Sequence, residues 1–273
     1  MSTAQSAGRN ATAAARRAAD SPVLDRLARV GLACRGVLYA LIGILAIQIA
    51  VGGGSKEQAD KGGAITTVAE LPFGSVLLWV MVVGFVALAL WQASEALFSH
   101  GRGLDRAEAA GRTAVYSLIV FTLVSVLLGS GAASEDKKSQ DITGKLLDLP
   151  AGEFIVGAVG LGIIGLGVYW IYQGAKKKFR EELNLGQMSP SARSVMEKLG
   201  TAGYIARGVI AGLAGIFVIQ AAITHDEDKA GGIDATLRAF AETPVGPWLL
   251  VAIALGLMLF AGYCFGESRW RRT

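Results

Sequence analysis

The chain has 273 residues, of which 52% are hydrophobic and only 18% charged, with 36 glycines, a mean hydropathy of +0.47 and a net charge of +4. This composition excludes an ordinary soluble globular domain and indicates a polytopic membrane protein. The two cysteines offer neither a disulfide framework nor metal-ligand spacing, and no histidine lies in an apolar stretch where it could bind a haem. We therefore expect no metal and no cofactor.

Residues 1–26 are rich in Ala, Ser and Arg and lack the apolar core and cleavage site of a secretory signal. We interpret them as a disordered basic tail on the cytoplasmic side. A mitochondrial presequence has a similar composition and is the alternative.

Six windows of low charge follow, and each is long enough, or nearly so, for the roughly 20 helical residues that cross a bilayer core. They are Gly36–Ser55, Leu71–Ser94, Thr113–Ser134, Phe154–Ala175, Gly208–Thr224 and Thr243–Gly266. The sequence thus predicts an all-α protein with six transmembrane helices.

Lysine and arginine are distributed unequally between the two sides that alternate loops would occupy. One side has 17, namely the N-terminal tail, the second and fourth loops and the C-terminal end, whereas the other side has 7. The positive-inside rule then places both termini on the cytoplasmic side, and we expect the protein in the plasma membrane. Because this asymmetry accounts for the net charge, we expect no nucleic-acid partner.

A two-helix unit occurs three times, and each copy contains a Pro-x-Gly that opens its second helix, at Pro72, Pro150 and Pro244. The same spacings around these prolines recur in all copies: a glycine about 40 residues upstream, a glycine 12 downstream, an aromatic residue 19 downstream and a polar residue 23 downstream. We infer three tandem hairpins at 27–100, 101–180 and 181–273, the last including a linker. Since each hairpin crosses twice, all three point the same way and predict a pseudo-threefold bundle.

The downstream positions share one stripe of the second helix, because their offsets differ by 7, 4 and 11 residues. They are Gly84, Trp91 and Glu95 in the first repeat, Gly162, Tyr169 and Gln173 in the second, and Gly256, Tyr263 and Glu267 in the third. We expect this stripe to turn inward. The mixed apolar and polar residues just before each Pro-x-Gly favour a short helix in the outer interface.

These repeats resemble the bacterial membrane family catalogued as domain of unknown function 1206, which has an Arg-Gly in each first helix and an aromatic residue plus Glu near the end of each second helix. The resemblance extends from about Leu27 to Arg272 and implies membrane location and architecture, but no established activity. The middle copy departs from the family pattern, because Val115-Tyr116 replaces Arg-Gly.

Arg35 and Arg207 are the charged residues of the two repeated Arg-Gly-Val cores. An arginine near the bilayer centre costs about 3 kcal/mol on insertion scales, so it usually has a partner. The copies with Arg have Glu95 and Glu267 at the polar position, and the copy without Arg has Gln173. We hypothesise ion pairs Arg35–Glu95 and Arg207–Glu267, within a hairpin or between neighbouring ones.

Such pairs either lock helices in register or form a site for an anion, a lipid headgroup or a proton-linked substrate. Two basic runs at helix ends also favour anionic lipid. They contain Lys176, Lys177 and Lys178 in one run and Arg269, Arg271 and Arg272 in the other.

The sequence contains no P-loop, no Ser-His-Asp set and no dinucleotide fingerprint, so we expect no enzyme. The hypothesis we favour is a non-enzymatic scaffold or accessory protein that binds lipid or partner helices. A small transporter or channel, with a pathway between the three hairpins, is the alternative.

Overall fold

The computed structural model describes residues 21–51, 58–98, 103–131, 135–230, 233–241 and 244–272. These residues are nearly all helical, and among them the only β-type pairing is one isolated bridge between Leu183 and Arg271. Six of the described helices are long and apolar enough to cross a membrane. They are α2 (Pro22–Ala50), α4 (Gly74–Phe98), α5 (Gly103–Leu127), α7 (Gly152–Ala175), α8 (Pro190–Thr224) and α10 (Gly246–Trp270).

Each of the six predicted windows contains a long helix, although three of these helices, α2, α5 and α8, begin much earlier than their windows. The last residues of the windows Gly36–Ser55 and Thr113–Ser134 lie outside the described part of the chain. Helices α2 and α8 both start at a Ser-Pro pair, in which the serine hydroxyl accepts a hydrogen bond from the backbone of the first turn and the proline occupies the first helical position. Residues 22–26 are therefore helical, which corrects the predicted extent of the tail. Residues 1–20 lie outside the described part of the chain.

A short helix precedes the second long helix of every repeat, as predicted. These helices are α3 (Lys61–Ala69), α6 (Glu135–Leu147) and α9 (Ile233–Ala241). The Pro-x-Gly motif now has a physical reason. The middle residue has a left-handed backbone at Phe73 and Ala151, and a Cβ on the following glycine, Gly74 or Gly152, would collide with carbonyl groups of the short helix.

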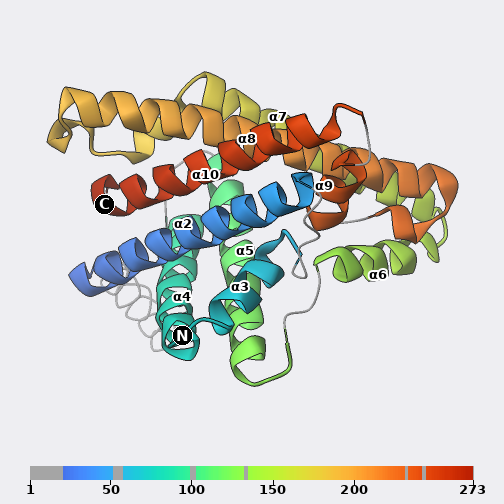
Figure 1. Ribbon diagram of the computed structural model, residues 1–273, viewed down its shortest axis with the longest axis horizontal. Helices are drawn as coiled ribbons and strands as arrows, with labels where there is room; N and C mark the ends of the chain where they lie inside the picture. Colours follow the sequence, from blue (N-terminus) through green and yellow to red (C-terminus); the bar gives the residue numbers. More distant parts are fainter. Residues whose placement is uncertain are drawn as a thin grey trace, which may run out of the picture.

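The closest helix packing occurs between successive repeats, not within them. The second long helix of one repeat packs on the first long helix of the next: α4 on α5, α7 on α8, and α10 back on α2. In Figure 1, α2, α8 and α10 lie side by side, whereas α4 and α5 are steeply inclined to them. The three sequence repeats are therefore joined in a closed cycle, which we call the cyclic packing.

The middle repeat is open where the others are closed. In the first repeat, α2 meets α4 where Gly31 and Gly84 are in backbone contact, and in the third repeat Gly203 packs on Phe260. The equivalent glycines of the second repeat, Gly111 and Gly162, have no such neighbour within 4 Å. Helices α5 and α7 accordingly make no packing contact comparable to those of α2 with α4 or α8 with α10.

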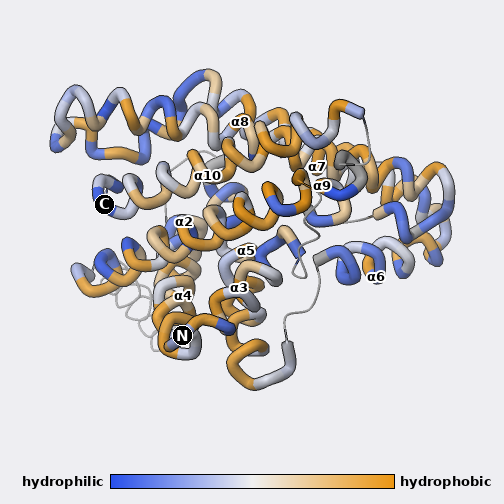
Figure 2. Tube along the Cα trace, viewed as in Figure 1, coloured by the Kyte–Doolittle hydropathy of each residue, from blue (hydrophilic) through white to orange (hydrophobic). Residues whose placement is uncertain are grey.

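Glycine packing is tightest between α7 and α8. Gly160 faces the carbonyl of Gly215, and Gly167 faces Gly208 and Gly212, so the two backbones approach closely. The main apolar core lies among α2, α3, α4, α5 and α10. Figure 2 shows the apolar stretches along the long helices, with hydrophilic residues concentrated at helix ends and along α6.

We call the end of the molecule where α2 begins and α10 ends the charged end. The connection from α7 to α8 crosses it through two 3-10 turns, η1 (Lys178–Glu182) and η2 (Leu185–Gln187). The backbone N–H of Asn184 donates to the carbonyl of Trp270, and the backbone N–H of Arg272 donates to the carbonyl of Glu182. The connection is thereby fastened to the C-terminal turn of α10.

Candidate functional site

Arg35 is a charged residue of the site whose guanidinium has both an ion pair and hydrogen bonds. Its guanidinium forms an ion pair with Glu267 of α10, and donates hydrogen bonds to the hydroxyl of Tyr116 on α5 at 2.9 Å and to the sulfur of Cys264 at 3.3 Å. The side chain of Glu267 is 1% exposed and that of Arg35 is 12% exposed. A buried charge with this set of partners is compensated, which is the condition for its tolerance in an apolar interior.

A chain of ion pairs continues from Glu267 through the charged end, and we call it the charge network. Glu267 also binds Arg271, one turn later on α10, and Arg271 lies 3.6 Å from Glu182 of the connecting segment. Glu182 in turn binds Arg112 of α5 at 2.9 Å. The network therefore joins all three repeats.

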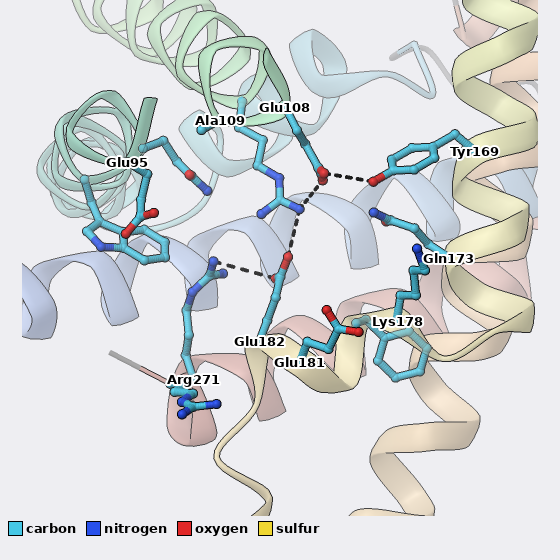
Figure 3. Close-up of a pocket in the computed structure, with 14 residues that line it drawn as sticks. Glu95, Glu108, Ala109, Tyr169, Gln173, Lys178, Glu181, Glu182 and Arg271 are labelled. Atoms are coloured by element: carbon cyan, nitrogen blue, oxygen red, sulfur yellow. Dashed lines mark hydrogen bonds and ion pairs between the residues drawn. The ribbon is translucent and has the colours of Figure 1, made fainter. Parts of the chain in front are cut away.

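The last members of the charge network connect α5 to α7 (Figure 3). Arg112 pairs with Glu108 on its own helix, and the hydroxyl of Tyr169 on α7 donates to Glu108 at 3.0 Å. Three guanidiniums, those of Arg35, Arg271 and Arg112, are thus matched by three carboxylates. The network carries no excess charge.

Glu182 is the network carboxylate that lies outside the long helices. Burial by itself raises its pKa, but the neighbouring Arg112 and Arg271 outweigh burial and lower the pKa to about 2. The carboxyl is therefore ionised throughout the physiological pH range.

The hypothesised partners of the arginines are wrong. Arg35 pairs with Glu267 of the third repeat instead of Glu95, and Arg207 forms no ion pair with any residue that the structure describes. The physical reason is the cyclic packing: the end of each second helix lies beside the first helix of the next repeat. Within one hairpin, the two positions do not meet.

The same rule explains which charges are left without a partner. Under cyclic packing, Glu267 meets Arg35, Gln173 belongs with Arg207, and Glu95 belongs with Val115. Because the middle repeat lacks both the arginine and the glutamate, its two neighbours each lose a partner. Arg207 loses a carboxylate, and Glu95 loses a guanidinium.

Arg207 instead lies in a cage of aromatic rings. Its guanidinium carbon lies 4.2 Å from the ring centre of Trp170, 4.6 Å from that of Phe260, 5.4 Å from that of Tyr39 and 5.8 Å from that of Tyr204. Trp170 is the repeat equivalent of Cys264, which accepts a hydrogen bond from Arg35. The two arginines therefore occupy equivalent places with different surroundings.

Glu95 is exposed and lines a pocket of about 350 Å³ at the charged end. The pocket lies between the ends of α4, α5 and α7 and the connecting segment, and Figure 3 shows Glu108, Tyr169 and Gln173 directed toward it. It occupies the space where α5 and α7 would converge in a closed middle repeat. No ion pair of Glu95 occurs within the described ranges.

The predicted stripe turns inward throughout the third repeat, where Glu267 is also buried, and only in part in the first repeat, where Glu95 is exposed. Gly84, Gly256 and Tyr263 are buried, and Trp91 is half-buried with Arg271 stacked 4.1 Å from its ring centre. In the middle repeat Gly162 and Tyr169 are exposed, although Gln173 is buried. The exception follows from the open packing of α5 and α7.

The two basic runs differ in their availability to lipid headgroups. Lys176, Lys178, Arg269 and Arg272 are exposed, while Lys177 pairs with Glu197 at 2.7 Å. Arg271, by contrast, is buried in the charge network. Its assignment to a lipid-facing surface is therefore wrong, because its guanidinium is already bound by Glu267 and Glu182.

Sequence reasoning missed Tyr116, Arg112, Glu182 and Trp170. Tyr116 could have been found, because it replaces the repeat glycine next to the missing arginine. Arg112 and Glu182 carried no repeat signal, since Arg112 lies outside the recurring motif positions and Glu182 lies in the linker. Only the tertiary contact between these segments identifies them.

Comparisons with known proteins agree with the threefold repeat. The family described as Domain of Unknown Function (DUF1206) matches the chain three times, at residues 30–99, 107–177 and 202–271. The chain is also 29% identical over 249 residues to the uncharacterized protein YxxB of Bacillus subtilis strain 168, covering 89% of each chain. No solved structure matches it significantly.

Proposed function

The chain belongs to the DUF1206 family, and we propose that it is a non-enzymatic multipass protein of the plasma membrane that acts as a scaffold or accessory protein by binding lipid or partner helices. Its charged end faces the cytoplasm in this proposal, as the excess of lysine and arginine on that side favours. Both termini then lie in the cytoplasm.

The open middle repeat is the observation that carries the proposal. Helices α5 and α7 bury only 17% of their apolar windows, against 39–50% for the other four long helices. The glycines Gly111 and Gly162, whose equivalents in the other repeats contact a neighbouring helix, have none within 4 Å. A surface of small and apolar residues at membrane depth suits close approach by another helix or by lipid.

Site-specific photo-cross-linking in native membranes tests this proposal. A photoreactive residue at Leu161 or Leu166, both exposed on α7, should give a discrete adduct with a membrane protein or with lipid. The matched control is Val156 on the same helix, which is 1% exposed and should cross-link only within the chain. Equal external adducts from all three positions would contradict the proposal.

A transporter is the second candidate, and the pocket lined by Glu95, Glu108 and Arg112 is the observation that favours it. Measuring the flux of labelled ions and solutes in reconstituted vesicles separates the two. We expect no flux above that of empty vesicles. Robust transport that Arg207→Ala abolishes would reverse the ranking.

A further inference from the structure

We propose that Arg207 is the centre of an anion-binding site that holds the phosphate of an anionic membrane lipid. The proposal narrows the proposed scaffold function to lipid binding at a defined place, and it rests on that function. Arg207 lies in a membrane-type helix, as Arg35 does. Arg35 shows how the same position is satisfied when the protein itself supplies an anion.

Arg35 and Arg207 differ in the partners that the protein gives them. Arg35 receives a carboxylate from Glu267 and a hydroxyl from Tyr116. At the equivalent positions around Arg207, the carboxylate is replaced by the neutral Gln173 and the tyrosine by Gly36. Arg207 therefore lacks the equivalents of both oxygen ligands that bind Arg35.

The positive charge of Arg207 is not compensated by the charge network. The charge network is balanced by itself, so its carboxylates leave no charge over for Arg207. The four aromatic rings around the guanidinium interact favourably with a cation, but they neither neutralise its charge nor accept strong hydrogen bonds from its N–H groups. An intramembrane arginine normally pairs with another charged group or with backbone carbonyls.

Phosphate is the anion whose geometry suits the guanidinium of Arg207. Guanidinium presents several N–H donors in a planar fork that matches the oxygens of phosphate. The guanidinium carbon lies over the ring of Trp170, which is half-buried. A lipid phosphate carries an attached apolar chain, which a site between apolar helices accommodates and which an inorganic ion lacks.

Lipid retention by purified protein in nanodiscs tests the inference. Native mass spectrometry should show that the wild type retains phosphatidylglycerol in preference to phosphatidylcholine. Arg207→Gln should weaken retention at least about tenfold, as expected for losing a charged hydrogen-bond donor. Glu95→Gln is the matched control and should retain the lipid as the wild type does, because under the cyclic packing Glu95 belongs with Val115 and not with Arg207.

A second variant supplies the missing ligand. Gln173→Glu should restore to Arg207 the carboxylate that Glu267 gives Arg35, and it should release phosphatidylglycerol while raising the melting temperature. This variant keeps the test valid if Arg207→Gln fails to fold. Wild-type retention by either variant would overturn the inference.

Inorganic phosphate distinguishes the two sources of this chemistry. It should not compete with phosphatidylglycerol at millimolar concentration, and full competition would overturn the assignment to a lipid. A failure of the proposed lipid site can be told apart from a failure of the proposed scaffold function. Flux in vesicles would refute the scaffold, whereas retention by Arg207→Gln would refute only this site.

Discussion

At the scale of single residues, the stability of this protein depends on how a few buried charges are paired. Glu267 accepts ion pairs from two arginines, and its side chain is 1% exposed. Glu95 occupies the equivalent place one repeat earlier but is exposed. The same residue type at the same repeat position should therefore contribute much to stability in one repeat and little in the other.

Glu267→Gln should destabilise the protein by about 3–5 kcal/mol, because it leaves Arg35 buried without its anion. Glu95→Gln should change the free energy of unfolding by less than about 0.5 kcal/mol. Unfolding titrations in mixed micelles measure both. A double-mutant cycle should further couple Arg35 to Glu267 and not to Glu95, and the reverse coupling would show that the pairing within a hairpin is correct after all.

Glu182 determines a pH dependence at the charged end. Its pKa falls from 4.5 to about 2 on folding because of Arg112 and Arg271, so its contribution to stability is fully present above pH 4.5 and is lost as the pH falls to about 2. The melting temperature of the wild type should therefore exceed that of Glu182→Gln above pH 4.5, and the difference should shrink below it. A difference that is constant with pH would contradict this.

At the scale of helices, glycine decides which pairs of backbones approach closely. Helix α7 has glycines of two kinds. Gly160 and Gly167 face α8, whereas Gly157, Gly162 and Gly165 have nothing within 4 Å. Helix α7 thus has a packed face and an open face, both rich in glycine. Only on the packed face does the close approach of the two backbones require glycine.

Gly167→Ala should destabilise the α7–α8 pair by about 1–3 kcal/mol, because the new Cβ would lie 2.6 Å from the carbonyl oxygen of Gly208. Gly162→Ala on the same helix is the control, and it should be neutral or stabilise the helix by up to about 1 kcal/mol. Thermal unfolding of the two variants provides the comparison. Equal loss of stability in both would mean that α7 is packed on both faces.

At the scale of the whole molecule, the repeat in sequence and the unit of packing are offset by one helix. Each second helix is packed most closely on the first helix of the following repeat, and α10 closes back on α2. The two long helices of the middle repeat are split between the α4–α5 pair and the α7–α8 pair. The middle repeat is open because its two long helices do not meet at Gly111 and Gly162.

Two fragments, residues 1–131 and 132–273, should therefore associate when they are co-expressed, although the division cuts through the middle repeat. Their association depends on the α2–α10 contact and on the Arg35–Glu267 pair. Affinity purification of one tagged fragment should recover the other. Glu267→Gln should reduce that recovery, while Glu95→Gln should not. Independent fragments would refute the importance of the α2–α10 contact.

The long helices, the short helices before them and the threefold repeat could all be predicted from the sequence. These features depend on local patterns: apolar length, a Ser-Pro or Pro-x-Gly start, and residues recurring at fixed offsets. The presence of a partner for Arg35 was also predictable, because the cost of an isolated buried charge does not depend on the fold. The identity of that partner was not.

Amino-acid order alone determined that two arginines would lie in membrane-type helices and that the middle repeat would lack its own. Tertiary structure alone decided that Glu267 would bind Arg35, that Arg207 would meet aromatic rings, and that Glu182 would bridge Arg112 and Arg271. The physical reason is that helix formation is specified by neighbours in sequence, whereas the pairing of charges depends on which helix packs beside which. In this protein, packing between successive repeats, more than packing within them, decided which charges pair.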